Sequence, residues 1–185
     1  MTFLLLQRLI NLNQNFENHF YLCVNIKLYT MNLADNSKIW IFQANRKFSQ
    51  EEKETIISKL QNFMLDWNAH GAALLADFTL PYDQFIVVGV DENQATASGC
   101  SIDKLTKIIR ELDTDYNFEF LNRMLVAYEQ NEEILIEKLP IFKKNVKEGI
   151  IKDVNVFNNG IANLAEFKTS WKLPIEESWA KILLS

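Results

Sequence analysis

One cysteine and one histidine are the residues of this sequence best suited to chemistry. Cys100 lies in the segment Ser98-Gly99-Cys100-Ser101, whose serines predict the N-terminus of a helix. A thiol at a helix N-terminus is exposed to the positive end of the helix dipole, which favours the thiolate. We therefore consider Cys100 as a nucleophile with His70 as its base. Asp91 or Asp103 would be the acid that orients the histidine.

The same segment predicts a second chemistry, the binding of a small anion. Free backbone amides point outward at the start of a helix and can hold an anion there. The predicted binding residues are Trp67, Gly71, Ser98, Gly99 and Ser101. The nearest cation is Lys104, and no cluster of Lys or Arg lies beside the segment.

Carboxylates near this segment suggest a metal site as a further alternative. Asp91, Glu92 and Asp103 carry the oxygen ligands that Mg²⁺ or Ca²⁺ prefers. Solvated loop acids are the simpler interpretation, so we expect neither a metal nor a cofactor.

Each candidate also has a structural interpretation. A single free cysteine is commonly a small buried hydrophobic residue, and a histidine beside a glycine commonly ends a helix. The four tryptophans are expected in the core, whereas an exposed pair would indicate a protein-binding surface.

The elements that position these residues follow from caps, turns and hydrophobic spacing. Ser49 and Glu52 form a capping box, so a first helix begins there and ends near Trp67. The second helix follows Ser98, and Pro81 presets the turn of a hairpin. The predicted strands are residues 38–43, 73–79, 85–91, 123–128 and 134–138. The order β-α-β-β-α-β is the split βαβ, or ferredoxin-like, α+β arrangement.

In this topology four element ends share one edge of the sheet. They are the end of the first helix, the start of the second strand, the end of the third strand and the start of the second helix. We therefore expect one group of neighbouring residues there: Trp67, His70, Asp91, Glu92, Ser98, Cys100, Ser101 and Asp103.

The remaining segments are predicted to extend this core, residues 31–138. In residues 139–185, Pro140 opens a short helix, residues 154–157 form a strand, and a last helix starts at Pro174. We expect this extension to pack on the core. Residues 1–30 carry three charges and no clear period, so we predict a non-native or disordered extension with the true start at Met31.

Composition excludes several classes of protein. The 185 residues are 48% hydrophobic and 23% charged, which is typical of a globular protein. A net charge of -5 argues against nucleic-acid binding, and no apolar run is long enough to span a membrane. Two cysteines are too few for a disulfide framework, which favours the cytoplasm.

Several segments carry a family resemblance. They are residues 38–43, 67–71, 98–103, 123–125, 156–159 and 177–179. Over residues 31–180 the chain resembles a family of short bacterial cytosolic proteins that carry the label "ABC transporter ATPase". The resemblance brings no catalytic residue with it. An ATP-binding cassette requires Gly-x-x-x-x-Gly-Lys-Ser/Thr, and none of the five glycines here precedes a lysine.

These observations favour a binding or interaction protein over an enzyme. Its partner would be a protein or a small anionic ligand. The alternatives are a thiol-dependent enzyme or a redox or anion sensor that uses Cys100 with His70, and the ATPase that the family label names.

Overall fold

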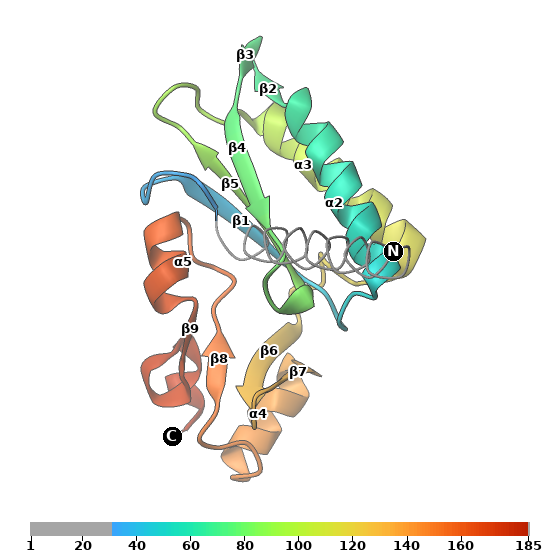
Figure 1. Cartoon of the computed structure of the whole chain (residues 1–185). Coiled ribbons are helices and arrows are strands. Elements are labelled where there is room, and N and C mark those ends of the chain that lie inside the picture. Colours follow the sequence, from blue (N-terminus) through green and yellow to red (C-terminus); the bar gives the residue numbers. More distant parts are fainter. Residues whose placement is uncertain (1–30, 185) are drawn as a thin grey trace, which may run out of the picture.

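The computed structural model describes residues 31–184. These residues are built around two antiparallel sheets (Figure 1). The first sheet has the order β1-β5-β4, made of Lys38–Gln43, Phe85–Asp91 and Leu75–Thr79. The second has the order β7-β6-β8-β9, made of Glu133–Lys138, Leu125–Gln130, Asn155–Phe157 and Lys172–Pro174. A small ribbon pairs β2 (Asn68–Ala69) with β3 (Ala72–Ala73).

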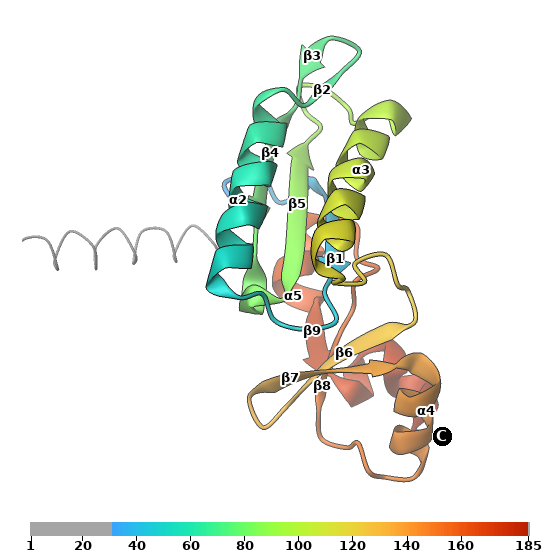
Figure 2. The same cartoon turned by 90° about the vertical axis from the view of Figure 1, so that its right-hand side faces the viewer.

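Two long helices lie side by side on one face of the first sheet (Figure 2). Helix α2 (Gln50–Leu65) begins at a complete capping box: the Ser49 hydroxyl accepts the Glu52 amide hydrogen, and the Glu52 carboxylate accepts the Ser49 amide hydrogen. Helix α3 (Gly99–Tyr116) begins at Ser98, whose hydroxyl accepts the Ser101 amide hydrogen. Both predicted helix starts are confirmed.

The core between sheet and helices follows from the alternation of side chains along β5. Ile86, Val88 and Val90 face the helices and share one buried cluster with Leu60 of α2 and Leu105 of α3. All five are fully buried. Because burial of one such aliphatic side chain contributes about 1.5–3 kcal/mol, this cluster is a main source of stability.

The C-terminal part of the chain covers the opposite face of the first sheet. Phe85 and Val87 point to that face and share a cluster with Phe157 and Trp171. The rings of Phe85 and Trp171 meet edge to face, with centroids 4.9 Å apart. Helix α5 (Leu164–Ser170) lies beside β1 in Figure 1. The first sheet is therefore buried on both faces.

The second sheet has a smaller core of its own. Val126 and Tyr128 of β6 share a cluster with Phe142 on α4 (Leu139–Lys147). Two short 3₁₀ segments, Ile175–Glu177 and Trp179–Leu183, complete this cluster. Burial beside Glu137 raises the pKa of Tyr128 to about 12, so its hydroxyl stays neutral.

The mixed α+β class, the first two helices and the predicted hairpin are confirmed. Strands β4 and β5 pair antiparallel around a 3₁₀ turn, Pro81–Asp83. The four-stranded ferredoxin-like sheet is not confirmed, because β6 pairs with β7 and β8 instead of joining β1. The apolar side chains of β6 are buried against α4, which fixes that strand in the second sheet.

The C-terminal extension differs most from its prediction. The predicted strand at residues 154–157 and the helix opened by Pro140 are present as β8 and α4. Helix α5 and strand β9 were not predicted. The predicted last helix is wrong, because Pro174 ends β9 and two 3₁₀ segments follow it. The predictions for residues 1–30 lie outside the described residues.

Candidate functional site

Two residues of the predicted edge cluster, Trp67 and Ser101, are joined by a hydrogen bond. Trp67 follows α2, is 1% exposed, and donates its indole hydrogen to the Ser101 carbonyl at 2.8 Å. This bond joins the end of α2 to the first turn of α3, as the predicted topology requires. Trp67 therefore acts as a packing residue rather than as part of an open binding surface.

The serines at the start of α3 are engaged in capping. The Ser98 hydroxyl accepts the Ser101 amide hydrogen at 3.3 Å, and the Ser101 hydroxyl donates to the Ser98 carbonyl at 2.8 Å. Ser101 is buried, while Gly99 is exposed and has open space around its Cα. Both hydroxyls thus have partners within the helix cap, and the predicted anion cradle rests on backbone amides alone.

The predicted thiol site is not assembled by hydrogen bonds. His70 and Gly71 form the exposed tip of the β2–β3 ribbon, both with positive φ angles. Cys100 is a free exposed thiol, and Asp103 is exposed on α3. Within residues 31–184, no hydrogen bond or ion pair connects Cys100, His70 and Asp103. The catalytic role of these three residues therefore stays a prediction.

The acidic residues nearby stabilise their own loop. The Asp91 carboxylate accepts the Asn93 amide hydrogen at 2.9 Å, and the Glu92 carboxylate accepts the Ala97 amide hydrogen at 3.1 Å. No group of three or more His, Cys, Asp or Glu side chains suited to a metal occurs in the described part of the chain.

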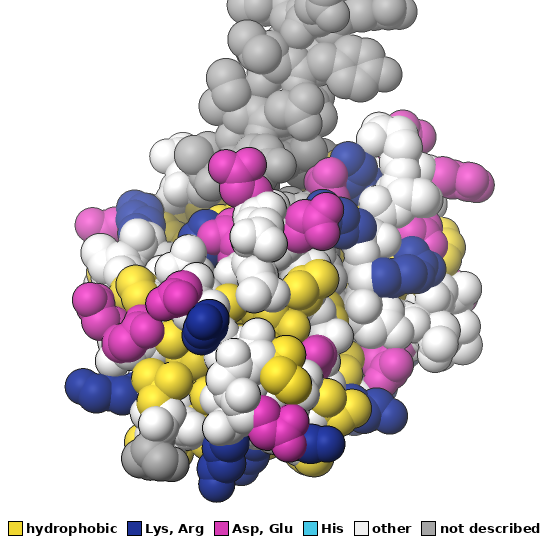
Figure 3. Space-filling view, turned by 90° about the horizontal axis from the view of Figure 1, so that it is seen from below, with side chains coloured by type: hydrophobic (Ala, Val, Ile, Leu, Met, Phe, Trp, Pro, Cys, Tyr) yellow, Lys and Arg dark blue, Asp and Glu magenta, His cyan; other side chains and the backbone are white. Residues whose placement is uncertain are grey.

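The tryptophans do not form the exposed pair that would indicate a protein-binding surface. Trp179 is 39% exposed and donates to the Phe157 carbonyl, whereas Trp67 and Trp171 are buried. The face that contains α4 carries exposed Ile141 and Ile182 as well. Figure 3 shows that apolar side chains on this face lie among Lys, Arg and acidic side chains.

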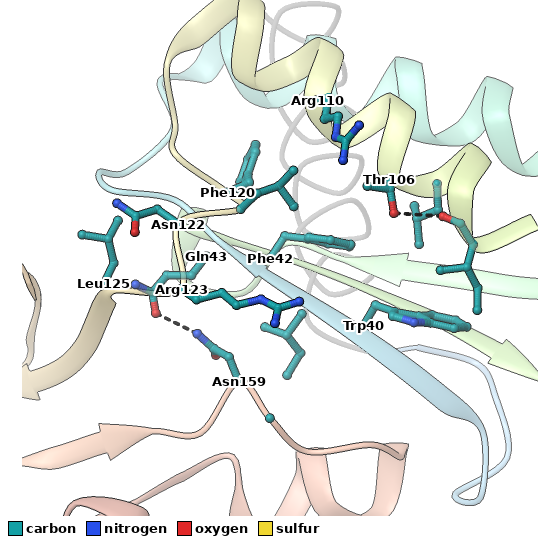
Figure 4. Close-up of a pocket in the computed structure, with 15 residues that line it drawn as sticks. Trp40, Phe42, Gln43, Thr106, Arg110, Phe120, Asn122, Arg123, Leu125 and Asn159 are labelled. Atoms are coloured by element: carbon teal, nitrogen blue, oxygen red, sulfur yellow. Dashed lines mark hydrogen bonds between the residues drawn. The ribbon is translucent and has the colours of Figure 1, made fainter. Parts of the chain in front are cut away.

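A cavity lies elsewhere, along the outer edge of β1 (Figure 4). It has a volume of about 770 Å³ and lies between β1, α3, the loop before β6 and the loop after β8. We call it the β1 cleft. Its lining residues are Trp40, Ile41, Phe42, Gln43, Ile102, Leu105, Thr106, Arg110, Phe120, Leu121, Asn122, Arg123, Leu125, Asn159 and Gly160.

Two unpaired cations stand at the β1 cleft. Arg110 extends from α3 and Arg123 from the loop before β6 (Figure 4). Both are exposed, and in residues 31–184 neither guanidinium takes part in a hydrogen bond or an ion pair. By contrast, Arg46 forms a two-bond pair with Glu52. No lining residue is acidic, so Arg110 and Arg123 are the charged side chains of the lining.

A chain of side-chain hydrogen bonds fixes a polar group in the wall of the cleft. The Trp171 indole, which can only donate, bonds the Asn159 carbonyl oxygen at 3.0 Å. The Asn159 amide nitrogen therefore donates to the Gln43 side-chain oxygen at 2.7 Å. This order leaves Gln43 Nε2 as the last group of the chain.

Gln43 Nε2 is buried and has no hydrogen-bond partner among the described residues. The Gln43 residue is only 7% exposed. A buried donor without an acceptor costs about 1–3 kcal/mol, so its retention needs a reason. Gln43 lines the β1 cleft, so this unpartnered amide group belongs to a residue of the cleft wall.

Sequence reasoning did not find this site. Gln43 stands at the end of a predicted apolar strand. A single polar amide after Ile, Trp and Phe is the one feature of the sequence that could have pointed to the site. Its partner Asn159 is 116 positions away, and no local pattern connects the two. The sequence predicts that Arg123 begins a strand, whereas β6 begins only at Leu125.

Comparisons with protein families, curated proteins and solved structures found no match for this chain. The family resemblance of the sequence therefore stays a prediction. Among residues 31–184, none of the helices combines the length and apolar character needed to cross a bilayer.

Proposed function

We propose that this protein is a cytosolic binding protein that holds an anionic ligand in the β1 cleft. The observation that carries the proposal is the buried, unpartnered Nε2 of Gln43. Its orientation is fixed by Asn159 and Trp171, so the unpartnered group of the Gln43 side chain is a donor and not an acceptor. An oxygen acceptor on the ligand is the group that fits it.

The two arginines indicate the charge of the ligand. Charge-assisted bonds from guanidinium to carboxylate or phosphate are stronger than neutral hydrogen bonds. Arg110 and Arg123 are free to make them, and no acidic side chain in the lining competes. Trp40, Phe42 and Phe120 supply apolar wall, which favours a ligand with an apolar part beside its anionic group.

The thiol-dependent alternative has weaker support. Cys100 is accessible, as that alternative requires, but His70 and Asp103 make no hydrogen bond with it in the described residues. The ATPase alternative lacks the phosphate-binding loop in its sequence. Neither alternative has a buried polar atom without a hydrogen-bond partner at its site, whereas the β1 cleft has Gln43 Nε2.

The test is an NMR titration of the full chain with three anion probes: glutarate, benzoate and inorganic phosphate. We expect at least one probe to shift the side-chain signals of Gln43, Arg110 and Arg123 and to reach saturation. Because two charge-assisted bonds are lost, the double variant Arg110→Gln, Arg123→Gln should weaken that probe at least tenfold, roughly 1.4 kcal/mol.

Lys107→Gln is the matched control, since Lys107 is an exposed cation of α3 outside the cleft lining. It should leave the affinity unchanged. Absence of saturation for all three probes would contradict the proposal. An equal loss of affinity in the Lys107 variant would show attraction by overall charge instead of a site.

A further inference from the structure

The backbone of β1 has an edge that faces the cleft. The Ala44 amide donates to the Gln84 carbonyl, which continues the register of β1 with β5. The backbone groups of the even-numbered residues of β1 therefore point toward β5. Backbone groups alternate in direction along an antiparallel strand. The amide and carbonyl groups of Ile41 and Gln43 therefore point away from β5, toward the open edge.

Both ends of this edge are closed by other segments. The Ile39 amide donates to the Ala162 carbonyl at 3.0 Å, beside the bridge between Lys38 and Asn163. At the other end, the Asn45 amide donates to the Phe118 carbonyl at 2.8 Å. The open stretch thus begins after Ile39 and ends before Asn45.

Within this stretch the outward backbone groups of Ile41 and Gln43 have no hydrogen-bond partner among the described residues. Both residues line the β1 cleft. A strand edge with unpaired amides and carbonyls is a template for one more strand. The stretch covers residues 40–44, so five residues of an extended segment, at about 3.3 Å each, would span it.

Resting on the proposed function above, we infer that the natural ligand of the β1 cleft is an extended acidic segment of another protein, which adds to β1 as a short strand. Main-chain bonds to Ile41 and Gln43 give such a complex its affinity, and side-chain contacts give its specificity. Arg110 and Arg123 select an acidic side chain because they are unpaired and no lining carboxylate opposes them.

This inference explains why the polar groups of the cleft are of two kinds. A small anion would satisfy the arginines and Gln43 Nε2 but would leave the β1 edge unpaired. An extended peptide also pairs the edge, because its carbonyls accept from the edge amides and its amides donate to the edge carbonyls. The side-chain acid then lies against the guanidinium groups.

Peptide binding and amide hydrogen exchange on the full chain provide the test. The probes are acetylated and amidated pentapeptides with a central Glu and flanking Val, Thr, Ala or Tyr, each matched by the same peptide with a central Gln. In the free protein, Trp40 and Phe42 amides should exchange slowly and those of Ile41 and Gln43 rapidly.

We expect Glu peptides to bind more tightly than their Gln partners and to slow the exchange of Ile41 and Gln43 at least tenfold. N-methylation of the peptide backbone should abolish binding, and Arg110→Gln with Arg123→Gln should weaken it, whereas Lys107→Gln should not. The two proposals fail separately. Saturable glutarate binding without any preference for Glu peptides, or peptide binding that leaves Ile41 exchange unchanged, would overturn the strand inference alone. Failure of peptides and all small anions would overturn both.

Discussion

Replacing Gln43 by Met separates a role in ligand binding from a role in the fold. Methionine has a similar length and volume, so the variant retains the packing beside β5. The change removes the oxygen that accepts from Asn159 and the buried Nε2 that has no partner. If the Nε2 donor is kept for a ligand, the free protein gains stability when that donor is lost.

The expected gain follows from two opposing contributions. Removal of an unpaired buried donor should raise the free energy of unfolding by about 1–3 kcal/mol, while loss of the bond from Asn159 should lower it by about 1 kcal/mol. Asn159 is only half-buried, so its amide can bond to solvent in the variant. We therefore expect Gln43→Met to be more stable than the wild type by about 1 kcal/mol, or about 2–4 °C in Tm for a chain of this size.

Urea unfolding followed by tryptophan fluorescence measures this difference, and calorimetry gives the Tm independently. The same variant should bind the best anion probe about tenfold more weakly, since one hydrogen bond to a charged group is lost. A loss of more than about 1 kcal/mol of stability would refute the reasoning. It would mean that Gln43 Nε2 serves the fold itself.

Three further variants test the other assignments. Glu52→Gln removes a carboxylate whose pKa the Arg46 guanidinium lowers to about 2, so at neutral pH it should cost about 1 kcal/mol of stability in urea unfolding. A lowered pKa stabilises the fold only above the ordinary value, so this difference should disappear as the pH falls from 4.5 to about 2. Trp67→Phe removes the buried bond to Ser101 and should cost about 1–2 kcal/mol while leaving anion affinity unchanged, which titration checks. Cys100→Ser alters an exposed side chain and should change stability by less than about 0.5 kcal/mol, with no effect on anion binding; a large loss of anion binding would instead favour a site at Cys100.

The parts of the fold that sequence predicts correctly are those with local causes. Ser49 and Glu52 are three positions apart and cap each other, so the helix start can be inferred without any tertiary contact. Pro81 presets its turn in the same way. The destination of β6 depends instead on which partner buries Val126 and Tyr128, and only the assembled chain decides between β1 and α4.

The candidate site was out of reach for a related reason. Reactive side-chain types favour Cys100 and His70 as candidates. The β1 cleft depends instead on side-chain amides and arginines, which are common on any protein surface. Gln43 indicates a site only in the folded chain, where Asn159 and Trp171 fix the orientation of its amide and burial excludes water from it. Those three residues come from distant parts of the sequence, so no spacing rule connects them.

The limited length of the open β1 edge has a consequence for self-association. Unpaired strand edges are common starting points for aggregation, because copies of a chain can join edge to edge. Here the pairs at Ala162 and Phe118 leave room for only a few residues between them. A second copy brought to this edge would also place its own Arg110 and Arg123 against those of the first, and like charges repel. Both features oppose polymerisation through β1 and leave the short edge open to a strand of opposite charge.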